Sequence, residues 1–132
     1  MNVVLATSTG GFTLTLHQGF ARAFLIYSVL LGLWGLLLFV LGRNPSGGYL
    51  GALVIDEGLA VVQGIVGLVL RVQGHSPHDP LHYLYGVVAV ISLPAAYYLS
   101  DGATTRRDSL YFGIACLFLV GVAIRGIVTG SG

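Results

Sequence analysis

Two of the four histidines lie where imidazoles from different helices could hold a haem iron. His17 precedes the first long apolar stretch and His82 begins the third. In an up-down bundle those two helices run parallel, so the two rings could be axial ligands of a b-type haem, with Arg22 or Arg71 near its propionates. Haem ligands in membrane bundles generally lie within a span, whereas these residues lie at its ends. An interfacial histidine without a ligand role is therefore the favoured interpretation.

The other two histidines, His75 and His78, lie in a loop rich in proline and glycine. With Asp79 and His82 they give spacings of three and four residues, which resemble the spacings of zinc ligands. No cysteine accompanies them, and the prolines restrict the conformation of the loop. We therefore predict no metal site.

Two adjacent acids, Asp56 and Glu57, lie inside the second apolar stretch. With a rise of 1.5 Å per residue they lie roughly 10 Å below the nearer membrane surface, and intramembrane carboxylates face a bundle interior, a cavity or a partner. One interpretation is a carboxylate that accepts a proton or contacts a quinone. The favoured one is a structural anchor, paired across helices or subunits with an arginine such as Arg43. Helical spacing places the acids near one stripe with Ala60, Gln63, Gly64, Gly67 and Arg71.

No further constellation predicts catalysis. The sequence has no P-loop, no Gly-x-Ser-x-Gly, no His-Glu-x-x-His and no Cys-x-x-Cys motif. Nothing in it assembles a nucleophile, a base and an oxyanion site, so we predict that the chain is not an enzyme.

The composition places these residues in a membrane. Hydrophobic residues make up 55% of the 132 residues and charged residues only 8%, with a mean hydropathy of +0.88. A soluble domain carries about 25% charged residues to hydrate its surface, and a disordered chain is poor in apolar residues. Both classes are therefore excluded. The net charge of +1 leaves no basic surface for nucleic acid.

Four apolar stretches are long enough to cross a bilayer core of about 30 Å. Short polar connections make successive helices antiparallel neighbours. The sequence thus predicts an all-α integral membrane protein, an up-down four-helix bundle with both termini on the same side. The expected spans are residues 20–42, 49–70, 81–99 and 109–128.

Residues 1–19 are too short and too polar to span. We predict an N-terminal interfacial arm there, followed by the four-helix transmembrane domain of residues 20–132. We name side A the side of both termini and of the 71–80 loop. Side B is the side of the loops 43–48 and 100–108. The six arginines divide equally between the sides. Counting loop residues alone favours side B as cytoplasmic, with a bacterial inner membrane as the location.

Small residues recur along the predicted spans and mark helix faces that can approach closely in lipid. Such faces favour packing within the bundle or against other subunits. The predicted packing residues are Ser28, Gly32, Gly35, Gly64, Gly67, Gly113 and Gly121.

The favoured function is a non-catalytic accessory subunit of a larger energy-transducing membrane complex, respiratory or photosynthetic. Its partners would be other membrane subunits and lipid, with no cofactor of its own. One alternative is a redox subunit that binds b-type haem through His17 and His82, or a quinone through Glu57. Another is a small dual-topology transporter, because the equal division of arginines permits both orientations and Glu57 could exchange protons for substrate.

Overall fold

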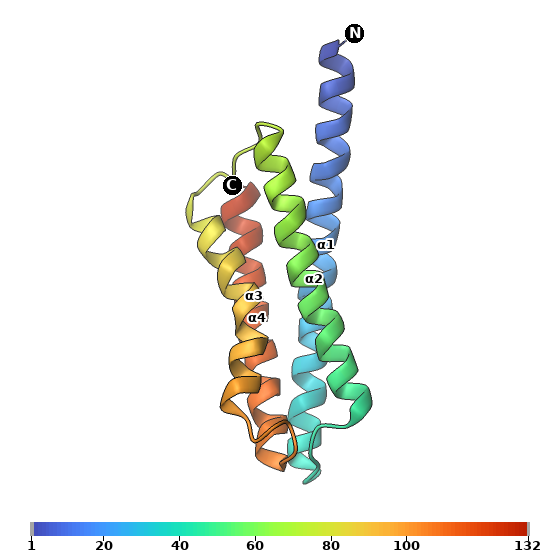
Figure 1. The fold of residues 1–132 in the computed structure, drawn as a ribbon, viewed down its shortest axis with the longest axis vertical. Coiled ribbons are helices and arrows are strands. Elements are labelled where there is room, and N and C mark those ends of the chain that lie inside the picture. The colour runs from blue at the N-terminus through green and yellow to red at the C-terminus, as the bar shows by residue number, and fades with distance from the viewer. Residues whose placement is uncertain (1, 132) are drawn as a thin grey trace.

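The chain forms an up-down bundle of four helices (Figure 1). The structure is a computed structural model that describes residues 2–131, with side chains described from residue 11 to residue 130. All four helices are long and apolar enough to cross a membrane, which confirms the predicted all-α membrane bundle. The helices are α1 (Asn2–Val40), α2 (Gly47–Val72), α3 (Leu81–Leu99) and α4 (Arg106–Ser131).

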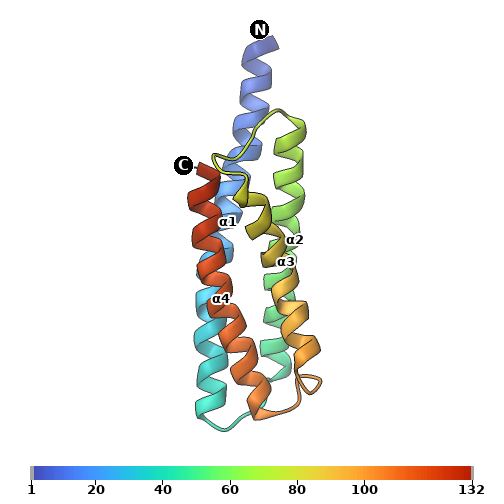
Figure 2. The ribbon, with the colours of Figure 1, turned by 90° about the vertical axis from the view of Figure 1, so that its left-hand side faces the viewer.

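Helix α1 is much longer than the predicted first span. It runs without a break from Asn2 to Val40, so the predicted arm and the first span are one helix and no boundary lies near residue 19. The segment contains no proline that would stop a helix. With 39 residues, α1 is about 58 Å long, and its first turns project beyond the other helices on side A (Figures 1 and 2).

The turns between the helices follow ordinary capping chemistry. Gly42 follows α1 with a φ of 73°, and Arg43 N–H donates to the Leu38 carbonyl at 2.8 Å, which closes the helix end. Ser46 then caps α2, because its hydroxyl accepts from Tyr49 N–H at 3.1 Å. Gly74, with a φ of 89°, ends α2 in the same way as Gly42 ends α1. These caps place the helix ends within a few residues of the predicted spans.

Glycines bring α1 and α4 into backbone contact. A Cβ added at Gly35 would lie 2.8 Å from the Gly113 Cα, and one added at Gly113 would lie 3.0 Å from the Leu36 nitrogen. Gly32 is buried in the same contact, where a Cβ would meet Leu117 at 2.6 Å. At Gly35 and Gly113 only residues without a Cβ allow this approach, so these glycines let α1 and α4 pack closely.

The other predicted packing residues behave differently from one another. Ser28 is fully buried and faces α2, and Gly67 faces the ring of His17, which lies 3.4 Å from an added Cβ. Gly64 and Gly121 are exposed, and a Cβ at either would meet no atom of the described residues within 4 Å. These two glycines lie on the outer surface of the bundle, so packing against other subunits stays the prediction for them.

Candidate functional site

Polar side chains from three helices converge inside the bundle near side A. His17 of α1 and His82 of α3 lie with their ring centroids 5.8 Å apart and their planes at 69°. Gln63 of α2 donates from Nε2 to the His17 carbonyl at 2.8 Å. Helix α4 contributes Gly126, whose carbonyl lies 2.8 Å from His82 Nδ1. We name His17, Gln63 and His82 the histidine cluster.

Hydrogen bonds determine which atoms of the histidine cluster carry protons. A backbone carbonyl can only accept, so His82 Nδ1 carries the hydrogen that it shares with Gly126. For the same reason the amide nitrogen of Gln63 faces the His17 carbonyl, and its oxygen points elsewhere. His17 Nδ1 and Gln63 Oε1 are buried and have no hydrogen-bond partner among the described residues. The cluster therefore holds two polar atoms that the described part of the chain leaves unpaired.

The cluster brings together the two histidines predicted as haem ligands, but its packing does not suit a haem. A flat macrocycle needs open space around the line that joins two axial rings. A Cβ added at Gly130 would lie 2.9 Å from His82 Cε1, and one added at Gly67 would lie 3.4 Å from His17 Cε1. Helix backbone thus lies close to both rings, and a macrocycle would require the helices to separate.

The arginines proposed to hold haem propionates lie elsewhere. Arg71 Nη1 donates to the Tyr83 hydroxyl at 2.9 Å, and its guanidinium lies 5.4 Å from the centre of that ring. Arg22 is exposed on α1. Arg71 therefore links the end of α2 to α3 at the side-A surface and is not directed at the histidine cluster.

The residues considered as zinc ligands do not converge. His75 and His78 are exposed in the loop between α2 and α3, whereas His82 is turned toward α4. Asp79 instead accepts from Leu81 N–H at 2.9 Å and so supports the first turn of α3. Within residues 11–130, no group of three or more His, Cys, Asp or Glu side chains could hold a metal ion.

Asp56 is fully buried and is anchored across helices by a hydroxyl. Ser28 Oγ of α1 donates to its carboxyl group at 2.9 Å to Oδ2 and 3.3 Å to Oδ1. The anchoring interpretation named an arginine such as Arg43 as the partner, and that partner was wrong. Arg43 is exposed, and its carbonyl accepts from Ser109 at 2.8 Å. The serine hydroxyl suits this place because it is neutral and brings no second charge into the apolar interior.

Glu57 points in a different direction from Asp56. It lines a groove of about 250 Å³ between α2 and α3, and its Oε2 is buried without a hydrogen-bond partner among the described residues. The groove is otherwise apolar apart from one tyrosine, and Phe112 of α4 contributes to its lining. Its other lining residues are Leu50, Leu53, Val54, Leu93 and Tyr97.

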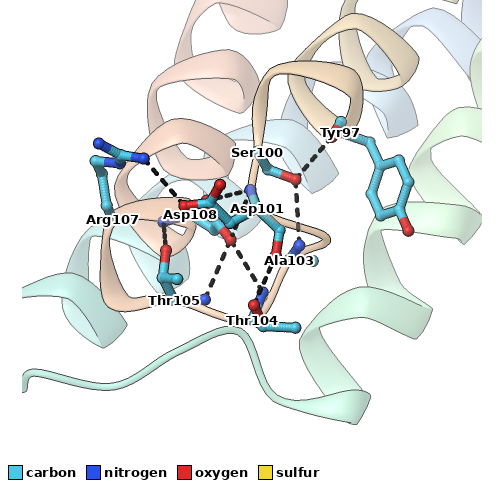
Figure 3. A network of polar contacts seen from close by, with 8 residues as sticks. All are labelled: Tyr97, Ser100, Asp101, Ala103, Thr104, Thr105, Arg107 and Asp108. Atoms are coloured by element: carbon cyan, nitrogen blue, oxygen red, sulfur yellow. Dashed lines mark hydrogen bonds and ion pairs between the residues drawn. The ribbon is translucent and has the colours of Figure 1, made fainter.

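A third polar cluster, which the sequence reasoning missed, holds the start of α4 on side B (Figure 3). Asp108 is fully buried and accepts from the backbone N–H groups of Asp101, Thr104 and Thr105 at 2.9–3.2 Å. Thr105 Oγ1 accepts from Asp108 N–H at 3.3 Å in return. This is a capping box, and the spacing Thr105-x-x-Asp108 is its sequence signal. Arg107 adds an exposed ion pair with Asp101 at 3.0 Å.

The three polar sites differ in whether their buried polar atoms have hydrogen-bond partners. Asp108 and Asp56 are satisfied by partners within the chain, so their arrangement serves the fold. The histidine cluster and Glu57 keep buried polar atoms without partners, and such atoms are rare in folded proteins. Comparisons with protein-family models, with curated proteins and with solved structures found no match for this chain.

Proposed function

We propose that this chain is a non-catalytic accessory subunit of a larger energy-transducing membrane complex, respiratory or photosynthetic. The observation that supports it is the projection of α1 beyond the bundle on side A (Figure 2). Near the start of α1, Phe12 is 67% exposed, and Leu14 and Leu16 are each 38% exposed. Apolar side chains that no other helix of the chain covers need lipid or a partner subunit around them.

The length of α1 favours a partner over lipid. Helix α1 has 39 residues and is about 58 Å long, whereas a bilayer core is about 30 Å thick. The segment 2–10 extends the helix further from the bundle. Isolated helices shorter than about 12–15 residues are marginal in water. A neighbouring subunit on side A would cover the apolar residues and stabilise these turns.

The contacts of the two buried aspartates also fit the role of an accessory subunit. Asp56 joins α1 to α2 through Ser28, and Asp108 holds the start of α4. Both carboxyl groups have partners within the chain, as expected where acids stabilise a scaffold. A subunit that braces larger neighbours needs this kind of internal fixation and no reaction centre of its own.

The test is native electrophoresis of membranes solubilised in mild detergent. We expect the chain to migrate with a complex that carries haem or pigment absorbance, and a Phe12→Ser variant to migrate as the free chain. Tyr98→Ser is the matched control, because Tyr98 is an exposed aromatic residue at the other end of the bundle. A wild-type chain that migrates alone under these conditions would refute the proposal.

A second candidate function is redox work through quinone contact, and the groove at Glu57 favours it. The apolar lining suits a quinone ring, and the unpaired Oε2 offers one polar contact to a quinone oxygen when the carboxyl group is protonated. The same carboxyl group could instead exchange protons for a substrate in a transporter.

Quinone binding is measurable by quenching of the single tryptophan, Trp34, whose ring lies 5.1 Å from that of Tyr49. Saturable quenching by a short-chain quinone, weakened in Glu57→Gln and kept in Asp101→Asn, would support the redox candidate. Proton-coupled uptake into vesicles that is lost in Glu57→Gln, without quinone quenching, would support the transporter. Neither signal in the wild-type chain would exclude both roles for Glu57.

A further inference from the structure

The histidine cluster contains three side-chain atoms that could bind a ligand, one on each of its residues. Because Nδ1 of His82 faces the Gly126 carbonyl, Nε2 is the ring nitrogen that remains to bind a ligand. Gln63 Oε1 is free because the amide nitrogen binds the His17 carbonyl. His17 Nδ1 is buried without a partner among the described residues, on a ring whose centroid lies 5.8 Å from that of His82. The donors come from α1, α2 and α3, so the fold itself brings them together.

Burial of these atoms is costly unless something binds them. A buried polar atom without a partner costs about 1–3 kcal/mol, and His17 Nδ1 and Gln63 Oε1 are two such atoms in one cluster. The bond from His82 Nδ1 to the Gly126 carbonyl is the arrangement that metal-binding histidines use, since it fixes the ring and its tautomer. We propose that the histidine cluster binds a single transition-metal ion of the kind that prefers imidazole, with copper(I) favoured over zinc(II).

The separation of the two rings suits one shared ion. With a metal–nitrogen distance of about 2.0–2.1 Å and a ring centroid about 1.1 Å beyond the nitrogen, each centroid lies about 3.2 Å from the ion. Centroids 5.8 Å apart then subtend about 130° at the ion. This angle lies between tetrahedral and linear, so the separation of the two rings is one that a shared ion can bridge.

The charge of the cluster favours copper(I). Its donors are two imidazoles and an amide, all neutral, and the described residues bring no third His, Cys, Asp or Glu into the group. The cost of placing an ion in an apolar interior rises with the square of its charge. Calcium and magnesium prefer several oxygen ligands, usually with carboxylates among them. A singly charged ion that accepts imidazole nitrogen is therefore the best match.

The experiment uses the full chain in mild detergent, stripped with a chelator and titrated with copper(I) under reducing conditions and separately with zinc(II). We expect one equivalent of copper to bind the wild-type chain, with zinc weaker. His82→Asn can keep a donor toward the Gly126 carbonyl and loses the ligand, so copper binding should weaken about 100-fold. The matched control is the double variant His75→Ala and His78→Ala, which removes two exposed histidines on the same side and should bind as the wild type does.

A second measurement keeps the proposal testable if a variant is unstable. An ion that binds only the folded chain raises the unfolding temperature, so copper should raise it for the wild type and the loop variant and not for His82→Asn. Absence of one-equivalent binding, or full binding by His82→Asn, overturns the proposal. Tighter binding of zinc than of copper overturns the preference for copper(I). Co-purification of one haem that depends on His17 and His82 overturns the proposal in favour of haem ligation. The outcome does not depend on whether the chain assembles with other subunits.

Discussion

The close contact between α1 and α4 predicts that a single methyl group added at Gly113 lowers the stability of the protein. Gly113→Ala would place a Cβ 3.0 Å from the Leu36 nitrogen, 3.2 Å from the Gly35 carbonyl carbon and 3.3 Å from the Gly32 oxygen. All three atoms belong to the backbone, so no side chain can rotate away. The two helices would have to separate, and the neighbouring contacts would lose part of their dispersion energy.

The size of the effect follows from two opposing contributions. Inserting a methyl group into a packed core costs about 1–3 kcal/mol, and replacing a glycine inside a helix by alanine returns up to about 1 kcal/mol of helix propensity. We expect Gly113→Ala to lower the free energy of unfolding by about 1 kcal/mol. Gly121→Ala on the same helix meets no atom of the described residues within 4 Å, so it should raise that free energy by up to about 1 kcal/mol.

The two variants should be compared directly, by unfolding the chain in detergent micelles with increasing SDS and following helix content by circular dichroism. Both glycines lie inside α4, so the helix-propensity contribution cancels in the difference between them. The difference of about 1–3 kcal/mol then measures the packing contribution alone. Equal effects of the two substitutions would refute the backbone contact between α1 and α4.

Four further substitutions test the buried polar contacts by the same unfolding measurement. Ser28→Ala should lower the free energy of unfolding by about 1–3 kcal/mol, because it leaves the Asp56 carboxyl group buried without its donor. Asp56→Asn should lower that free energy by less, since the amide oxygen can still accept a hydrogen bond from Ser28. Equal losses in the two variants would contradict this reasoning. Asp108→Asn should cost about 0.5–2 kcal/mol through a weaker cap, and an unchanged midpoint would show that the cap adds nothing. Tyr49→Phe should cost about 0.5–1.5 kcal/mol by removing a bond of 3.0 Å to the Leu31 carbonyl, and a gain in stability would contradict that bond.

The helices were predictable because hydrophobicity over about 20 residues is a property of the sequence alone. The start of α1 was not, because residues 1–19 contain polar residues and lack a clear capping signal. A helix continues through such a segment when nothing ends it. Hydrophobicity alone therefore predicted a first span that begins well after the start of the helix.

The direction of each acid required knowledge of helix orientation. Asp56 and Glu57 are neighbours in sequence, and helical spacing placed both near the same stripe. Only the rotation of α2 against α1 turns Asp56 to Ser28 and leaves Glu57 in the groove beside α3. The partner was equally hard to predict, because serine is common in helices and carries no charge that would mark it.

The pairing of His17 with His82 was predictable from topology, since both residues lie at the side-A ends of parallel helices. The part played by Gln63 was not, because its amide binds a backbone carbonyl and that contact depends on the distance between α1 and α2. The capping box at Thr105 and Asp108 was present in the sequence as a short motif. A search for motifs at helix starts would have found it.

The contact between Gly35 and Gly113 also constrains the order in which the chain can assemble during synthesis. The two glycines are about 80 residues apart, and at 5–20 residues per second several seconds pass between their appearance from the ribosome. The α1–α2 hairpin is complete well before that, and the bond from Ser28 gives the Asp56 carboxyl group its partner at once. The face of α1 that contains Gly35 has no packing partner until α4 has been synthesised. During this interval its glycine surface is open to lipid, to chaperones or to α1 of another copy.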